Sequence, residues 1–181
     1  MVQKIAKHLL GLIGCAVFCA SSPVCGEDLS LASASLRYAF DDGGTEDFET
    51  YELVASSSPV WAWWAGEETL LAARLEGSLG TLRGDHESSL FVGLVPILEL
   101  VRTGFPLTLA VGVGPTVFSD HRVDSLDLGG ALNFTSSIRL GWWINRHLRV
   151  GYQYQHTSNA GIYDENDGID MHALSIGYGF R

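Results

Sequence analysis

The sequence GYQYQHTSNAGIYDENDGIDMHALSIGYGF, residues 151–180, predicts two strands joined by one polar loop. Side chains alternate between the two faces of a strand, so the apolar face of the first strand ends in His156 and Ser158. The matching face of the second strand begins with Asp170 and continues through large apolar residues to Phe180. If the strands pair, a serine, a histidine and a carboxylate meet at one rim of an apolar surface. That is the composition of a hydrolytic triad.

The first 26 residues have the features of a cleavable signal peptide, which leaves residues 27–181 as one domain. Lys4 and Lys7 precede an apolar run, residues 9–20, that is too short to span a bilayer. All three cysteines lie in this leader, which is typical of an exported bacterial envelope protein without disulfides. Removal of the two lysines changes the formal net charge from −10 to −12, which argues against a nucleic-acid partner.

The rest of the chain shows strand-like alternation and no long apolar run. Hydrophobic residues make up 46% of the chain, yet no run of about 18 apolar residues follows the leader, so no transmembrane helix is predicted. A membrane protein without helices must be a closed barrel, because lipid offers no partners to unpaired backbone groups. Alternation predicts eight strands, at residues 30–40, 49–55, 70–81, 90–101, 107–117 and 132–143 and in the two halves of 151–180.

One face of each predicted strand is aliphatic or aromatic, whereas the other carries small residues and charges. The charged positions on this second face are Arg37, Arg74, Glu76, Glu99 and Arg139. Small residues and paired charges fit the narrow interior of an eight-stranded barrel, so the apolar face is expected to meet lipid. We therefore predict an all-β fold, an eight-stranded antiparallel transmembrane β-barrel of the outer membrane, whose lumen is filled by small and polar side chains.

Loop lengths predict how the barrel is oriented. Long polar connections are expected at residues 41–48, 82–89, 118–131 and 159–169, and short ones near residues 102–104 and 145–146. Short turns are periplasmic in outer-membrane barrels, so the loop after Ser158 is expected outside the cell. The stretch 56–66 is a long exception at the short-turn end. All five tryptophans lie near this end and are expected to form an aromatic belt: Trp61, Trp63, Trp64, Trp142 and Trp143.

The polar residues at the rim have the spacing that ester hydrolysis needs. Ser158 and His156 lie two residues apart on one face, which puts their Cβ atoms about 6–7 Å apart. A base at this distance can reach the hydroxyl proton, while a carboxylate such as Asp170 holds the other ring nitrogen. A chain reversal that contains Gly161 follows Ser158 and can aim backbone N–H groups at an oxyanion. Glu165, in the loop, is the alternative acid.

The string His156-Thr157-Ser158-Asn159-Ala160-Gly161, followed by NDGID at residues 166–170, resembles the PagL-type lipid A 3-O-deacylases. The pair Asn133-Phe134 and the polar loop before it also resemble the corresponding part of this family. The resemblance implies an outer-membrane esterase that removes the primary acyl chain from the 3-position of lipid A. Its partner would be the lipopolysaccharide of the outer leaflet. We expect no cofactor and no metal, because the sequence holds neither a phosphate-binding glycine loop nor zinc-ligand spacing.

The resemblance also implies a role for each residue of the string. Ser158 matches the nucleophile of the family and His156 matches its base. The acid of the family is usually a glutamate, whereas this chain has Asp170, whose shorter side chain must be brought close by its backbone. Three positions match residues that support the site: Asn159 and Gly161, which are credited with oxyanion stabilisation, and Asn166.

Two other functions fit the same alternation. A non-catalytic small barrel could serve as an adhesin or an envelope scaffold, and an outer-membrane phospholipase or acyltransferase would share the triad. Only an enzyme needs Ser158, His156 and Asp170 together on the lipid-facing surface. The sequence leaves open the preferred acyl length, the regulation of activity and the formation of a homodimer.

Overall fold

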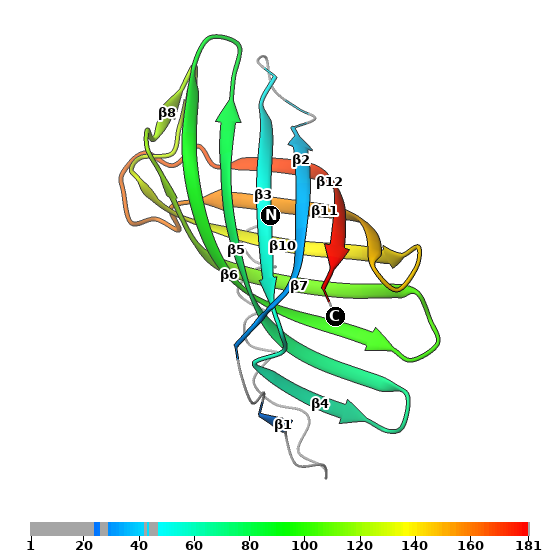
Figure 1. Cartoon of the computed structure of the whole chain (residues 1–181). Coiled ribbons are helices and arrows are strands. Elements are labelled where there is room, and N and C mark those ends of the chain that lie inside the picture. The colour runs from blue at the N-terminus through cyan, green and yellow to red at the C-terminus, as the bar shows by residue number, and fades with distance from the viewer. Residues whose placement is uncertain (1–23, 26–28, 42, 44–46, 181) are drawn as a thin grey trace.

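The computed structural model describes residues 24–25, 29–41, 43 and 47–180 (Figure 1). Within these residues, eight antiparallel strands close into a barrel, which confirms the predicted fold. The ladder is continuous around the barrel because the first strand pairs with the last. In chain order the strands are β2 (Leu31–Phe40), β3 (Glu49–Ser57), β5 (Thr69–Arg83), β6 (Ser88–Arg102), β7 (Leu107–Phe118), β10 (Leu132–Trp143), β11 (Leu148–Ser158) and β12 (Ile169–Gly179).

The long connection predicted at residues 56–66 is wrong in part, because it contains a strand, β4 (Trp61–Ala65). β3 pairs with the second half of β5, and β4 pairs with its first five residues, 69–73. β5 is 15 residues long, so β3 alone would leave the start of its edge without hydrogen-bond partners. Figure 1 shows β4 at the end of the molecule opposite the long loops.

The predicted leader, residues 1–26, lies outside the described residues except for Val24–Cys25. These two residues form β1, which pairs with β4. Signal-peptide cleavage after residue 26 therefore stays a prediction.

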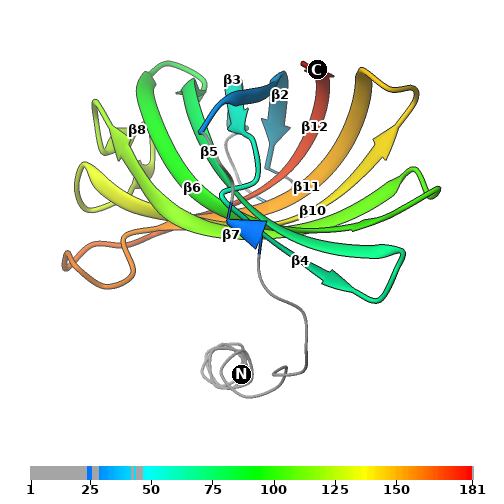
Figure 2. The ribbon, with the colours of Figure 1, turned by 60° about the horizontal axis from the view of Figure 1, so that its bottom comes forward.

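Burial along the strands confirms that the apolar face points away from the lumen. In β6, Leu94 and Leu98 are exposed, whereas Ile97 and Glu99 are buried. Figure 2 shows how strongly the strands curve around the interior. The described part of the chain holds no helix with the length and apolarity to cross a membrane. A continuous outer surface of leucine, isoleucine and valine is suited to hydrocarbon and not to water.

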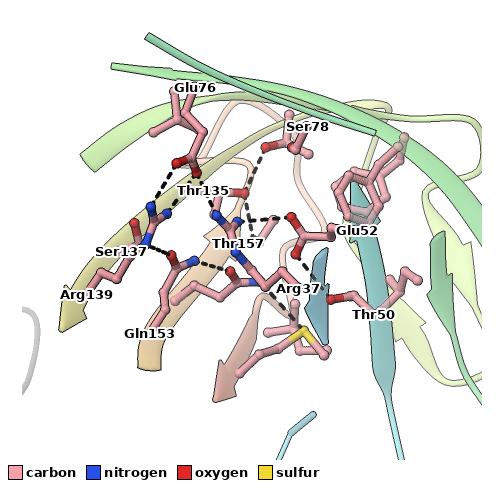
Figure 3. Close-up of a pocket in the computed structure, with 18 residues that line it drawn as sticks. Arg37, Thr50, Glu52, Glu76, Ser78, Thr135, Ser137, Arg139, Gln153 and Thr157 are labelled. Carbon is pink, nitrogen blue, oxygen red and sulfur yellow. Dashed lines mark hydrogen bonds and ion pairs between the residues drawn. The ribbon is translucent and has the colours of Figure 1, made fainter. Parts of the chain in front are cut away.

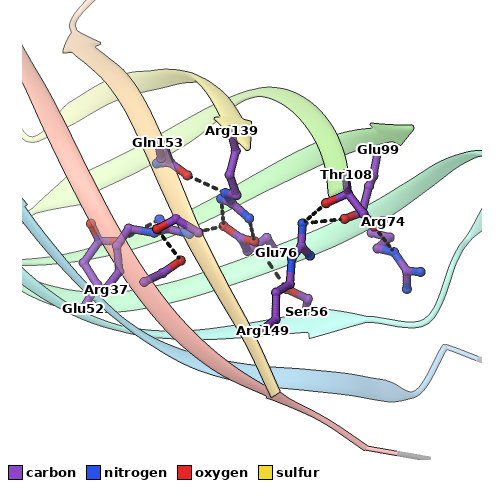
Figure 4. A network of polar contacts seen from close by, with 12 residues as sticks. Arg37, Glu52, Ser56, Arg74, Glu76, Glu99, Thr108, Arg139, Arg149 and Gln153 are labelled. Carbon is purple, nitrogen blue, oxygen red and sulfur yellow. Dashed lines mark hydrogen bonds and ion pairs between the residues drawn. The ribbon is translucent and has the colours of Figure 1, made fainter. Parts of the chain in front are cut away.

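Paired charges fill the middle of the lumen. Arg37 donates hydrogen bonds to Glu52 over 3.0 Å and to Glu76 over 2.6 Å, and Arg139 donates to Glu76 over 2.8 Å (Figure 4). A buried charge without a partner is costly, so each arginine makes the burial of a glutamate possible. A second group lies toward the short-turn end: Arg74, Glu99, Thr108 and Arg149.

The side chains leave little free volume inside the barrel. The cavity beside Thr50, Thr135 and Thr157 measures about 40 Å³ (Figure 3). This is room for about one water molecule. A second cavity, beside Trp143 and Arg146, measures about 190 Å³. The predicted lumen of small and polar side chains is therefore confirmed, and the interior is packed.

The tryptophans form only part of the expected belt. Trp142 is exposed on the outward face of β10. Trp143 faces the lumen instead, where the guanidinium carbon of Arg149 lies 5.5 Å from the centre of its ring. Successive residues of a strand point to opposite faces, so Trp63 and Trp64 cannot both point outward either.

An apolar cluster fills the long-loop end of the barrel. It includes Leu82, Phe91, Phe118 and Met171 from the barrel strands and Phe48, which directly precedes β3. The connection between β7 and β10 adds its own apolar side chains, Val123, Leu126 and Leu128, and contains a short hairpin of β8 (Arg122–Val123) and β9 (Leu126–Asp127). This loop is therefore packed down onto the barrel end.

Arginine in place of Leu109 should reduce the assembled fraction of the barrel. Leu109 is 41% exposed on the outward face of β7, and a charge on the lipid face costs about 2–4 kcal/mol near the bilayer midplane. Thr103→Arg, in the exposed β6–β7 turn, is the control that adds the same charge outside the barrel wall. The heat-dependent shift of the folded barrel on a gel measures assembly. Equal assembly of the two variants would contradict the assigned outward face.

Candidate active site

His156 and Asp170 lie directly opposite each other on β11 and β12. His156 Nδ1 lies 2.9 Å from Asp170 Oδ1, and the two side chains are 45% and 55% exposed on the outward face. An ionised carboxylate only accepts hydrogen bonds, so Nδ1 carries the proton. The other ring nitrogen, Nε2, is then left with a lone pair to act as a base.

Ser158 lies on the same face as His156, two residues nearer the loop, at the last position of β11. Gly168 lies where β12 is about to begin and brings the two side chains together. A Cβ atom on Gly168 would be 3.3 Å from His156 Cε1 and 3.5 Å from Ser158 Cβ. The side chains of His156 and Ser158 therefore both border Gly168. On its other side, Ser158 pairs through its backbone with Phe134 on β10.

Asn159 is the centre of the loop that follows the serine. Its side chain is fully buried and donates to the carbonyl of Leu128 over 3.0 Å and to that of Glu165 over 2.6 Å. Its amide oxygen accepts from the N–H of Gly161 over 2.8 Å. Its own N–H donates to Asn166 Oδ1 over 3.0 Å. Asn159, Gly161 and Asn166, all singled out by the sequence, thus form one hydrogen-bonded unit beside Ser158.

These contacts occupy two of the backbone N–H groups that the sequence offers for an oxyanion, those of Asn159 and Gly161. Between them lies Ala160, whose N–H makes no hydrogen bond within the described part of the chain. Ala160 has a φ of 56°, a left-handed conformation that is unusual for a residue with a side chain. Such backbone strain is often found at functional sites.

The β7–β10 loop holds the β11–β12 loop in place, and Figures 1 and 2 both show the two loops side by side. The N–H of Asp127 donates to Asp167 Oδ2 over 2.8 Å, and the N–H of Asp167 donates to the Asp127 carbonyl over 3.1 Å. The N–H of Gly129 and the guanidinium of Arg122 hold the pKa of the Asp127 carboxyl below its usual value. The carboxylate therefore stays ionised and keeps these bonds at neutral pH.

Gly129 is the tightest point of this contact. Its φ is +78°, and a Cβ atom there would lie 2.0 Å from the carbonyl oxygen of Glu165 and 2.7 Å from Asn159 Nδ2. Sequence reasoning missed this residue. The available signal was the pair Gly129-Gly130 in a loop of apolar and acidic residues, which predicts a turn and does not indicate its partner.

Gly129→Ala should lower activity by about 10- to 100-fold, because a shift of about 1 Å in the loop displaces the chain beside Ser158. Gly66→Ala is the matched control. Gly66 also has a positive φ, +75°, but nothing lies within 4 Å of its missing Cβ, so the variant adds the same backbone strain without the clash. Turnover on lipid A at equal folded fraction is the measurement. Equal activity of the two variants would show that the loop contact does not position the site.

Aromatic side chains continue the outward face below the pair of His156 and Asp170. The Tyr152 hydroxyl lies 2.6 Å from His172 Nδ1, and the ring of Tyr154 lies 5.5 Å from that of His172. His172 therefore belongs to an aromatic group on the outward face of β11 and β12, where the tyrosine rings combine an apolar body with a polar hydroxyl. Among the residues that the structure describes, no three His, Cys, Asp or Glu side chains are grouped to hold a metal ion.

A family model described as "Lipid A 3-O-deacylase (PagL)" matches residues 49–179. The lipid A deacylase PagL of Pseudomonas aeruginosa is 30% identical over 129 residues, which are 69% of this chain and 75% of that protein. The lipid A deacylase PagL of Bordetella bronchiseptica is 37% identical over 78 residues, 43% of this chain. That match spans 44% of the Bordetella protein, less than half of its length.

The crystal structure of the outer membrane enzyme PagL has the same fold, with a TM-score of 0.67 at 25% identity, covering 82% of this chain and 98% of that one. Together the comparisons confirm the predicted family, the hydrolase class and the outer-membrane location. With most of the barrel inside the family match, the chain belongs to the PagL family of lipid A 3-O-deacylases.

Proposed function

We propose that this protein hydrolyses the ester that joins a primary acyl chain to the 3-position of lipid A, with Ser158 as the nucleophile. The observation that carries the proposal is the 2.9 Å contact between His156 Nδ1 and Asp170 Oδ1, on the outward face and next to Ser158. The family match supports lipid A as the substrate class.

The chemistry follows from the protonation of His156. Nε2 takes the proton of the Ser158 hydroxyl while Oγ bonds to the carbonyl carbon of the ester. Asp170 stabilises the imidazolium that forms. When the tetrahedral intermediate collapses, the bond between the carbonyl carbon and the sugar oxygen breaks. The imidazolium gives its proton to that oxygen, which leaves an acyl group on Ser158.

Water completes the cycle by the same route. Nε2 takes a proton from a water molecule, whose oxygen attacks the acyl carbon. The bond to Ser158 Oγ then breaks, the serine takes back a proton from His156, and the fatty acid leaves. The oxyanion formed in both steps needs a hydrogen-bond donor, and the N–H of Ala160, two residues after Ser158, is a backbone donor that the described loop contacts leave available.

The position of the site suits a substrate in the outer leaflet. His156 and Asp170 lie about half exposed at the long-loop rim, where the hydrocarbon-facing surface of β11 and β12 ends. The ester bonds of lipid A lie between its sugar headgroup and its acyl chains, so they occupy the same level of the membrane. A charged carboxylate at this surface costs free energy unless it has a partner, and His156 provides one.

Mass spectrometry of lipid A from cells with and without the protein tests the activity. Expression should remove the mass of one primary acyl chain and release the corresponding fatty acid. Lipid A of unchanged mass beside a correctly assembled barrel would favour a scaffold or adhesin. Loss of acyl chains from phospholipids alone would favour a phospholipase.

A further inference from the structure

The tyrosines on the outward face of the barrel are gathered on the strands beside the candidate active site. The chain has six tyrosines, of which Tyr163 lies in the β11–β12 loop. The other five all lie on the outward faces of β2, β3, β11 and β12: Tyr38, Tyr51, Tyr152, Tyr154 and Tyr178. An aromatic girdle that anchors a barrel in the membrane interface surrounds the barrel. A group on one side of the barrel therefore needs another explanation.

Two of these tyrosines hold a carboxylate on the outward surface. Glu49, the first residue of β3, accepts hydrogen bonds from the hydroxyl of Tyr38 over 2.7 Å and from that of Tyr51 over 2.8 Å. The rings of the two tyrosines lie 5.3 Å apart. Arg83, the cross-strand neighbour of Glu49 on β5, attracts the carboxylate from beyond ion-pair distance. A carboxylate at the edge of the hydrocarbon costs free energy, so one held only by hydroxyl groups indicates a function.

A row of rings joins this carboxylate to the candidate active site. The ring of His172 lies 5.5 Å from that of Tyr154 and 6.0 Å from that of Phe40, and the ring of Phe40 lies 6.0 Å from that of Tyr38. These residues come from β11, β12, β2 and β3, which are neighbours in this order along the wall (Figure 2). Three inter-strand spacings, about 14 Å, separate β11 from β3. We call this row and its terminal carboxylate the aromatic strip: Tyr154, His172, Phe40, Tyr38, Tyr51 and Glu49.

The surface on the other side of Ser158 has a different character. There the outward residues near the long-loop end of β10 and β7 are apolar: Leu132, Phe134, Pro115 and Val117. A sugar carries hydroxyl and amide groups that need hydrogen-bond partners, and these four side chains offer none. The aromatic strip, in contrast, offers a carboxylate and several hydroxyl groups. The sugar part of a lipid substrate is therefore better matched on the side of β12, β2 and β3.

We propose that Glu49, Tyr38 and Tyr51 bind the second sugar of the lipid A disaccharide, the sugar that does not carry the scissile ester. The proposal rests on the proposed function, since the ester must sit at Ser158. Two linked sugar rings, with bonds of about 1.5 Å, extend roughly 12 Å. This length is close to the distance of about 14 Å between β11 and β3. The sugar that carries the ester then lies next to β12, and the second sugar reaches the carboxylate of Glu49.

The hydrogen-bonding capacity of Glu49 suits this role. A carboxylate has about four lone-pair positions, and the hydroxyls of Tyr38 and Tyr51 use one on each oxygen. The remaining positions can accept from the hydroxyl and amide N–H groups of a glucosamine. Hydrogen bonds to an ionised acceptor are stronger than those between neutral groups. The tyrosine rings add an apolar surface for the C–H groups of the sugar, while their hydroxyls fix the carboxylate in place.

A comparison of two substrates tests the proposal. Lipid A has the second sugar, whereas a diacylated glucosamine phosphate carries the same 3-linked ester on a single sugar. The quantity measured is the ratio of kcat/KM for lipid A to kcat/KM for the single sugar, at equal folded fraction in one detergent. Glu49→Gln should lower this ratio about tenfold, mainly through KM for lipid A, because it removes the charged acceptor and keeps the shape. Tyr51→Ala should lower the ratio as well.

Glu68→Gln and Tyr178→Ala are the matched controls. They change an exposed carboxylate and an exposed tyrosine at the short-turn end of the barrel, far from the aromatic strip. Both variants should keep the wild-type ratio. A ratio that falls as much in these controls as in Glu49→Gln would overturn the sugar site.

The remaining outcomes separate the two proposals. No cleavage of either substrate by assembled wild-type protein would overturn the proposed function and, with it, the sugar site. An active wild type whose ratio is the same in Glu49→Gln and Tyr51→Ala would overturn the sugar site alone. An unchanged ratio together with a lower assembled fraction, measured by the gel shift of the folded barrel, would also overturn it and would make the aromatic strip a membrane anchor.

Discussion

Ser158→Ala is expected to lower the rate of lipid A deacylation at least about 10³-fold while the barrel assembles normally. A nucleophile has no substitute in a covalent mechanism, so its loss leaves only the catalysis that binding and the oxyanion site provide. Ser158 is the last residue of β11, and its side chain borders the loop and not the lumen, so the change removes little packing. Release of fatty acid by purified protein, at equal folded fraction, is the measurement.

The matched control is Ser88→Ala, which removes an exposed hydroxyl at the same rim, on β6. It should keep wild-type turnover. A serine-directed phosphonate reagent gives an independent readout, because it reacts with an activated serine. Label on Ser158 in wild type, absent in His156→Ala, supports the assignment. Deacylation that survives Ser158→Ala would exclude this serine as nucleophile.

Asp170→Asn is expected to lower kcat by about 10²- to 10⁴-fold with little change in assembly. An amide can donate to Nδ1, which favours the tautomer that carries the proton on Nε2 and removes the base. Asp170→Glu should keep activity within about tenfold, because the longer side chain still carries a carboxylate that can reach His156. The half-exposed position of Asp170 makes a large loss of stability from either change unexpected.

Glu165→Gln is the control for the acid. In the structure, Glu165 contributes its backbone carbonyl to the Asn159 side chain, a contact that the substitution preserves. The variant should therefore keep wild-type activity. If Glu165→Gln loses turnover on lipid A and Asp170→Asn keeps it, the loop supplies the acid. The contact between His156 and Asp170 then has no catalytic role.

Much of the fold could be predicted because alternation is a strong signal when the two faces differ in character. Exposed Leu94 and Leu98 alternate with residues that face the lumen, and the charge of Glu99 marks the inner face without ambiguity. The pairing of His156 with Asp170 was predictable for the same reason. His156 lies near the end of one strand and Asp170 near the start of the next, both on the outward face. A hairpin between the two strands brings these positions together.

The contacts between loops could not be predicted in this way. Nothing local connects Gly129 with Glu165, or Asp127 with Asp167, because loops lack the periodicity that fixes strand register. The sequence does not predict β4 because WAWWA, residues 61–65, lacks the alternation of apolar and polar residues that marks a strand. Its strand conformation depends on pairing with the start of β5.

The most direct test of the central claim is to find the position of the ester that purified protein cleaves. Wild-type protein is incubated with lipid A in detergent, and fragmentation mass spectrometry locates the missing acyl chain. Wild-type protein should remove the 3-linked primary chain, whereas Ser158→Ala should leave lipid A intact. Loss of an acyl chain from any other position, or the same product from both proteins, would contradict it.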